Sequence, residues 1–207
     1  NNSGTIAATT YGISVFNSTV SAGITNSGSI SASSSIVLFN STVIGGVRNS
    51  GSISGASSGI NVVGTSLITG GISNTGTIVG GSGAGIYVGV GSTVVGASSG
   101  INNRGYISSI DNAGLITGSG AAVLITAGGL IASGITNSGT INGGSTGLNL
   151  QRATISGGLA NSGTIFGNSY GFVAFRSTLG GGLSNTGLIS GVNLGIYAIE
   201  STISGGL

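Results

Sequence analysis

Residues 137–160 read NSGTINGGSTGLNLQRATISGGLA, and this stretch decides the fold because near-copies of it recur along the whole chain. Its apolar residues alternate with small or polar ones, which is the two-residue period of a β-strand and not the 3.6-residue period of a helix. Gly, Ser and Asn separate the alternating runs and are typical of tight corners. The stretch therefore predicts three short strands joined by corners.

The motif Asn-x-Gly-x-Ile marks each copy. Successive main anchors are 24, 23, 25, 38, 25, 24 and 24 residues apart, and an additional copy of the motif begins at Asn103. One unit of this size cannot bury its own apolar side, whereas units stacked along an axis can. The spacing predicts an all-β fold, a parallel β-solenoid (β-helix) that forms a single domain over residues 1–207, with about eight coils of ~24 residues and three short strands in each. With strands ~4.8 Å apart, such a rod is roughly 40 Å long.

The repeated asparagine is expected to lie at a corner, where stacked amides hydrogen-bond from coil to coil. The glycine two residues later tolerates the backbone conformations that corners demand. We interpret the asparagine column as structural. The predicted ladder consists of Asn2, Asn26, Asn49, Asn74, Asn112, Asn137, Asn161 and Asn185.

Composition excludes several classes of function. The chain has six charged residues and no Lys, so it lacks the basic cluster that a nucleic-acid partner needs. No apolar run approaches the roughly 18 residues of a transmembrane segment. It has no His or Cys, and its single Asp and single Glu lie several coils apart, whereas glycoside hydrolysis usually needs two carboxylates within ~10 Å. We therefore expect no enzyme activity, no cofactor and no metal site.

The outward side of the second strand in each unit is unusually apolar. A large exposed apolar patch usually marks an interaction surface, so this face is the predicted lateral interface. Its members are Phe16, Val37, Phe39, Val63, Tyr87, Leu124, Val173, Phe175, Tyr197 and Ile199.

Two further features stand out from the regular repeat. The 38-residue step predicts a loop insertion around residues 96–110, projecting from the rigid scaffold as binding loops often do. The predicted contact loop carries Asn103, Arg104, Tyr106 and Asp111. Equivalent spacing also stacks Arg152, Arg176 and Glu200 on consecutive coils, so Arg176 and Glu200 are expected to pair.

The repeated phrases G-[IL]-x-N-[ST]-G-x-I-x-G and S-T-[IVL] resemble the passenger regions of bacterial autotransporters and other large surface adhesins. The resemblance covers essentially the whole chain. It implies a solenoid displayed outside the cell or on a bacterial cell surface, without transferable catalytic residues and without a particular ligand.

Two functions remain open. The chain end GGL and the chain start NNSG together spell the internal phrase GGL-x-NSG, which predicts either head-to-tail stacking into a filament or surface fibre, or one window of a longer tandem array. The expected partner is then a second copy, through its ends and its lateral face. The alternative is an adhesin segment that binds a cell-surface or glycan ligand. Ice binding is disfavoured because the threonine columns are single and broken by leucine.

Overall fold

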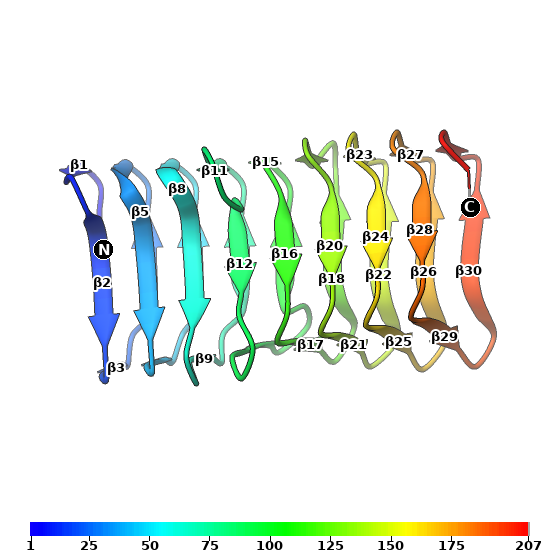
Figure 1. Ribbon diagram of the computed structural model, residues 1–207, viewed down its shortest axis with the longest axis horizontal. Helices are drawn as coiled ribbons and strands as arrows, with labels where there is room; N and C mark the ends of the chain where they lie inside the picture. The colour runs from blue at the N-terminus through cyan, green and yellow to red at the C-terminus, as the bar shows by residue number, and fades with distance from the viewer. Residues whose placement is uncertain (207) are drawn as a thin grey trace.

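The computed structural model describes residues 1–206 and consists of β-strands joined by turns, with no helix among these residues. The chain winds into a parallel β-solenoid of about eight coils at ~24-residue spacing, as predicted. Figure 1 shows the coils side by side along a straight rod, with the N-terminus at one end and the C-terminus at the other.

Each coil is a flattened loop with four sides, and each side forms a row of parallel strands along the rod. In the view of Figure 1, two long sides form a front wall and a back wall, and two short sides form an upper edge and a lower edge. The chain passes from the back wall over the upper edge to the front wall, and returns along the lower edge.

The strands of the four rows are as follows. The front wall contains β2 (Tyr11–Phe16), the second parts of β5 (Ser29–Phe39) and β8 (Ser52–Val63), β12 (Ile86–Val88), β16 (Ile110–Asn112), β20 (Ile135–Asn137), β24 (Leu159–Asn161) and β28 (Leu183–Asn185). The back wall contains β4 (Ile24–Asn26), β7 (Val47–Asn49), β10 (Ile72–Asn74), β14 (Ile101–Asn103), β18 (Ala121–Thr126), β22 (Thr146–Gln151), β26 (Tyr170–Phe175) and β30 (Leu194–Ile199). The upper edge contains β1 (Thr5–Ala7), the first parts of β5 and β8, β11 (Thr77–Gly80), β15 (Tyr106–Ile107), β19 (Leu130–Ile131), β23 (Thr154–Ile155), β27 (Thr178–Leu179) and β31 (Thr202–Ile203). The lower edge contains β3 (Thr19–Val20), β6 (Thr42–Val43), β9 (Leu67–Ile68), β13 (Thr93–Gly96), β17 (Leu115–Gly118), β21 (Thr140–Gly143), β25 (Thr164–Gly167) and β29 (Leu188–Gly191).

The core is a set of stacked aliphatic columns enclosed by the two walls and the two edges. Ile141, for example, lies in register between Ile116 and Ile165, and all three side chains are fully buried. Because equivalent residues of every coil point inward, each coil buries its apolar side against the coils above and below. This stacking gives the rod a continuous core that no single coil could form.

The coil has four strands, one more than predicted. The additional strand ends on the anchor asparagine, as in β20, where the sequence pattern predicts only a corner. The asparagine is the last residue of that strand, so it does lie where the chain turns. The two halves of a coil are thus alike: each has one wall strand followed by one edge strand.

The register of the sequence repeat shifts by half a coil in the middle of the rod. Up to β14 the anchor motif lies on the back wall, and from β16 onward it lies on the front wall. At this slip Asn112 stacks on Val88, and Ile125 stacks on Asn103. The 38-residue step therefore adds half a coil to the usual full coil.

The predicted loop insertion around residues 96–110 is wrong. This segment forms β14 and β15 and leads into β16, and these strands pair in register with β10, β11 and β12 of the preceding coil. The additional residues extend the solenoid because the buried Ile101, Asn103 and Ile107 have the same spacing as Ile72, Asn74 and Ile78 of the preceding coil.

Candidate functional site

The asparagines form two ladders and not the predicted single one. The Nδ2 of each asparagine donates to the Oδ1 of the next asparagine along the rod, over 2.7–2.9 Å. The back-wall ladder contains Asn2, Asn26, Asn49, Asn74 and Asn103, and the front-wall ladder contains Asn112, Asn137, Asn161 and Asn185. All eight predicted members thus lie in a ladder, but the slip divides them between opposite walls and adds Asn103.

Each ladder is closed at the slip by backbone groups. The Nδ2 of Asn103 donates to the carbonyl oxygens of Gly105 at 3.0 Å and Leu130 at 3.4 Å. The Oδ1 of Asn112 accepts a hydrogen bond from the N–H of Gly114 at 3.2 Å. These amides are buried, and burial of an unpaired polar group is costly, so the backbone contacts allow a ladder to end against an aliphatic neighbour.

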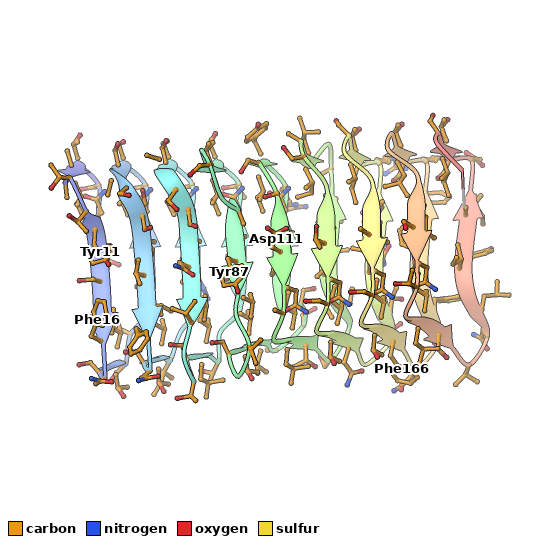
Figure 2. All side chains as sticks on the ribbon, viewed as in Figure 1. Tyr11, Phe16, Tyr87, Asp111 and Phe166 are labelled. Carbon is orange, nitrogen blue, oxygen red and sulfur yellow. The ribbon has the colours of Figure 1, made fainter. Side chains whose placement is uncertain are left out.

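The four residues of the predicted contact loop do not gather at one site. Asn103 is buried in the back-wall ladder, Arg104 is exposed at the corner that follows it, and Tyr106 is half-buried on the upper edge. Asp111 lies on the front wall, where it is in register with Tyr87 on one side and Thr136 on the other. Figure 2 shows Tyr87 and Asp111 on adjacent front-wall strands.

The environment of Asp111 changes its acidity. Partial burial raises the pKa of the Asp111 carboxyl above its ordinary value of 3.8, and a hydrogen bond from the Thr136 side chain opposes this shift. No group of three or more His, Cys, Asp or Glu side chains lies close enough to hold a metal ion within the described part of the chain.

The predicted lateral interface is divided between opposite walls. Because the repeat changes register at the slip, its first five members lie on the front wall of the N-terminal half, and the other five lie on the back wall of the C-terminal half. We call these the front patch (Phe16, Val37, Phe39, Val63, Tyr87) and the back patch (Leu124, Val173, Phe175, Tyr197, Ile199). The ten residues therefore do not share one side of the rod.

The front patch has the more exposed side chains of the two, and they lie toward the N-terminal end of the rod. Phe16 and Phe39 are 45% and 40% exposed, and their rings lie 5.7 Å apart. Val37, in register with Ser14 and Asn61, is buried at 5% exposure, so it contributes little to the surface. Figure 2 shows Phe16 and Tyr11 on β2, where Tyr11 enlarges the patch with its ring 6.1 Å from that of Phe16.

The back patch is half-buried and lies beside the column of Arg152, Arg176 and Glu200. Tyr197 stacks on Tyr170, with ring centres 5.3 Å apart, and the guanidinium of Arg176 lies 4.9 Å from the centre of the Phe175 ring. Arg176 Nε donates to Glu200 Oε2 at 2.5 Å, which confirms the predicted ion pair. Because both side chains are exposed, the pair contributes only ~0–1 kcal/mol.

Three aromatic residues of the surface were not predicted. Tyr11 and Tyr170 are the first residues of the wall strands β2 and β26, and each lies directly before a glycine. Phe166 follows the inward isoleucine of a lower-edge strand, and Figure 2 shows it on that edge. An aromatic side chain directly before the wall-strand glycine was the available signal for the two tyrosines.

The two end coils leave core columns partly open. Interior members of these columns are fully buried, whereas Ile6, Ile13 and Val20 at one end are only partly buried. At the other end Ile189 and Ile203 are also partly buried, and Ile196 is 38% exposed. Both ends of the described rod therefore present an apolar interior rimmed by strand edges.

Comparisons with protein-family models, with curated proteins and with solved structures found no match to this chain. Among the described residues, no helix has the length and apolarity needed to cross a membrane.

Proposed function

We propose that this protein is a structural element of an extracellular fibre, built by head-to-tail stacking of β-solenoid rods. One observation carries the proposal: each interior coil buries its apolar side only against the coils on either side of it, as Ile141 does between Ile116 and Ile165. Stacking a further coil of the same kind, from the same chain or from another copy, buries more apolar surface and pairs more strand edges. The resemblance to autotransporter passengers and surface adhesins supports a location outside the cell or on a bacterial surface.

Electron microscopy of the purified protein over a range of concentrations tests the proposal. We expect filaments much longer than one rod. Mass spectrometry of the same material measures the length of the chain from which they are built. Ile196→Lys places a charge in the open end of the core, and it should abolish elongation while the β-signal in circular dichroism is retained. Val192→Lys is the matched control, because Val192 is 81% exposed at a corner of the same end coil. Short rods at every concentration would reject stacking.

A second function is supported by the aromatic patches on the walls. An exposed pair such as Phe16 and Phe39 suits lateral association of rods, or an adhesin that binds a cell-surface or glycan ligand. Changing Phe16, Phe39 and Phe175 together to Ser should leave the β-signal intact while thinning filament bundles or weakening surface binding. Unchanged bundles and unchanged binding would show that these three residues have no role in association and are ordinary scattered apolar side chains of a protein surface.

A further inference from the structure

A groove lies on the back wall at the half-coil slip. Its volume is about 420 Å³, within the ~300–1,000 Å³ range of small-molecule sites, and it is open to solvent. Two arginines line it: Arg104 directly follows β14, and Arg152 directly follows β22. The strand β18 lies between these two strands and pairs with both.

The slip produces the groove because the corner between the back wall and the upper edge changes length there. Asn103 pairs with Ile125 on the back wall, and Tyr106 pairs with Leu130 on the upper edge. Two residues connect Asn103 to Tyr106, whereas four connect Ile125 to Leu130. A Cβ at Gly128, in the longer corner, would have no atom within 4 Å, so this corner stands out from the surface beside the shorter one.

Backbone hydrogen bonds hold the longer corner in place. The N–H of Ala127 donates to the carbonyl oxygen of Gln151 at 3.2 Å, and the N–H of Gly128 donates to that of Arg152 at 2.9 Å. Within the corner, the N–H of Gly129 donates to the carbonyl oxygen of Thr126 at 3.0 Å. The groove is therefore preformed, and a ligand does not have to order its backbone on binding.

The two guanidinium groups of the groove have no acidic partner. The ion pair of the described residues joins Arg176 to Glu200, and the other carboxylate side chain of the chain, Asp111, lies on the front wall. Arg104 and Arg152 are exposed and lie two strand positions apart, which is roughly 10 Å. Guanidinium groups bind carboxylates through paired, charge-assisted hydrogen bonds, so the groove is suited to an anion of this kind.

The other lining side chains suit the hydroxyl groups and the ring of a sugar. Asn102, Thr126 and Gln151 contribute amide and hydroxyl groups, which both donate and accept hydrogen bonds as sugar hydroxyls do. Leu124 is half-buried in register between Asn102 and Asn149, and it offers an apolar surface to the C–H face of a ring. Among the described residues, no aromatic side chain lines the groove, whereas single-stranded nucleic acids bind by stacking on aromatic rings.

A second hollow continues the groove along the rod. It has a volume of about 240 Å³, and Asn102 lines both hollows. Arg48 lines the second hollow and lies in the same outward row as Asn102, with Ser73 in register between them. Three of the four arginines of the chain thus lie along one stretch of the back wall, and the fourth, Arg176, is held in the ion pair.

We infer that the back wall at the slip binds a glycan that carries carboxylates, such as an oligosaccharide of uronic or sialic acids. A carboxylate lies between Arg104 and Arg152, hydroxyl groups of the same sugar contact Asn102 and Gln151, and a longer chain continues toward Arg48. This inference rests on the second function proposed above, binding of a glycan by an adhesin, and it specifies the class of glycan and the site.

A glycan array tests the ligand class. It contains oligosaccharides of galacturonic acid and of sialic acid, the methyl esters of the same oligosaccharides, and sulfated and neutral glycans. We expect the protein to bind carboxylated glycans and not their esters, because esterification removes the charge and retains the sugar. Equal binding to the esters, or binding confined to sulfated or neutral glycans, overturns the inference.

Arg104→Gln and Arg152→Gln test the site by calorimetric titration with the carboxylated glycan that binds most tightly. Each should weaken binding by roughly tenfold, because charge-assisted hydrogen bonds are lost. Arg176→Gln is the matched control, since it removes the same charge outside the groove from a residue whose φ of 50° matches the 52° of Arg152. All three side chains are exposed, so the circular dichroism spectrum should not change. Equal weakening by Arg176→Gln would show that overall charge, and not the groove, binds the glycan.

Arg48→Gln tests the direction of the bound chain. It should weaken binding of a long oligomer of the selected sugar by a larger factor than binding of its dimer, because only the long oligomer reaches the second hollow. Equal weakening of both, or of neither, would refute the path toward Arg48.

Two results separate this inference from the function on which it rests. If changing Phe16, Phe39 and Phe175 together to Ser abolishes binding to cells while Arg104→Gln and Arg152→Gln retain it, the adhesin function holds and the groove is not the site. Binding to cells without binding to any carboxylated glycan likewise overturns the inference alone. If the protein binds no glycan and no cell surface, the adhesin function itself fails.

Discussion

Replacing Ile141 with alanine tests whether the stacked isoleucine column holds the rod together. The side chain is fully buried and lies between Ile116 and Ile165 of the adjacent coils. The substitution removes three carbons, worth about 2.4 kcal/mol at ~0.8 kcal/mol per methylene. The coil spacing is set by backbone hydrogen bonds, so the cavity cannot close fully, and we expect a total loss of ~2–5 kcal/mol.

Guanidinium denaturation followed by far-ultraviolet circular dichroism measures this loss, with Thr140→Ala as the control. Thr140 is adjacent to Ile141 but points outward and is only partly buried, so its replacement should cost well under the isoleucine change. Repeat proteins can unfold in sections, so amide hydrogen exchange in residues 137–160 should show whether the loss is local. An unchanged transition for Ile141→Ala would show that this column is not part of the core.

Three further outcomes follow from the structure. Asn137→Ala removes ladder bonds to both neighbours and should destabilise by ~1–3 kcal/mol, less than the isoleucine change, in the same denaturation assay. Gly139→Ala places a Cβ 2.2 Å from the carbonyl oxygen of Gly114 and should disrupt the coil, whereas Gly4→Ala in the equivalent column of the back wall should be tolerated in a melting experiment; equal melting temperatures would contradict the close approach. Burial raises the pKa of Asp111, so the folded protein binds this proton more tightly than the unfolded chain does, and stability should fall as pH rises from below 3.8 through the raised pKa. Asp111→Asn should remove that fall, and a parallel pH profile for the variant and the parent would refute the assignment.

The sequence was sufficient to predict the solenoid because every coil repeats the same inward positions. For example, an isoleucine follows each of the eight main anchors by four residues, and all eight isoleucines lie in core columns. The fourth strand was not predicted because a run such as Ile135–Asn137 has only one aliphatic inward residue and ends in a polar one. Its strand character comes from pairing with the neighbouring coils.

The half-coil slip could not be predicted from spacing alone. In one half of a coil the inward wall residues are an aliphatic residue and the anchor asparagine, as in Ile24 and Asn26, and in the other half they are two aliphatic residues, as in Ile36 and Leu38. The two inward wall residues are two positions apart in both halves, so a wall strand of either half can stack on one of the other, as β16 does on β12. The division of the lateral face follows from that choice of register, and the burial of Val37 depends on neighbours that only the folded structure brings together.

The equivalence of the two half-coils gives the rod a parity rule. A gene duplication or deletion that adds or removes one half-coil keeps the core columns aligned, so the unit of length change in such a protein is about a dozen residues and not a full coil. An even number of added half-coils leaves every surface feature downstream on its original wall. An odd number transfers the downstream aromatic patch, ion pair and asparagine ladder to the opposite wall in a single event. A lineage of such rods could thereby change which side faces a neighbour without altering any surface residue.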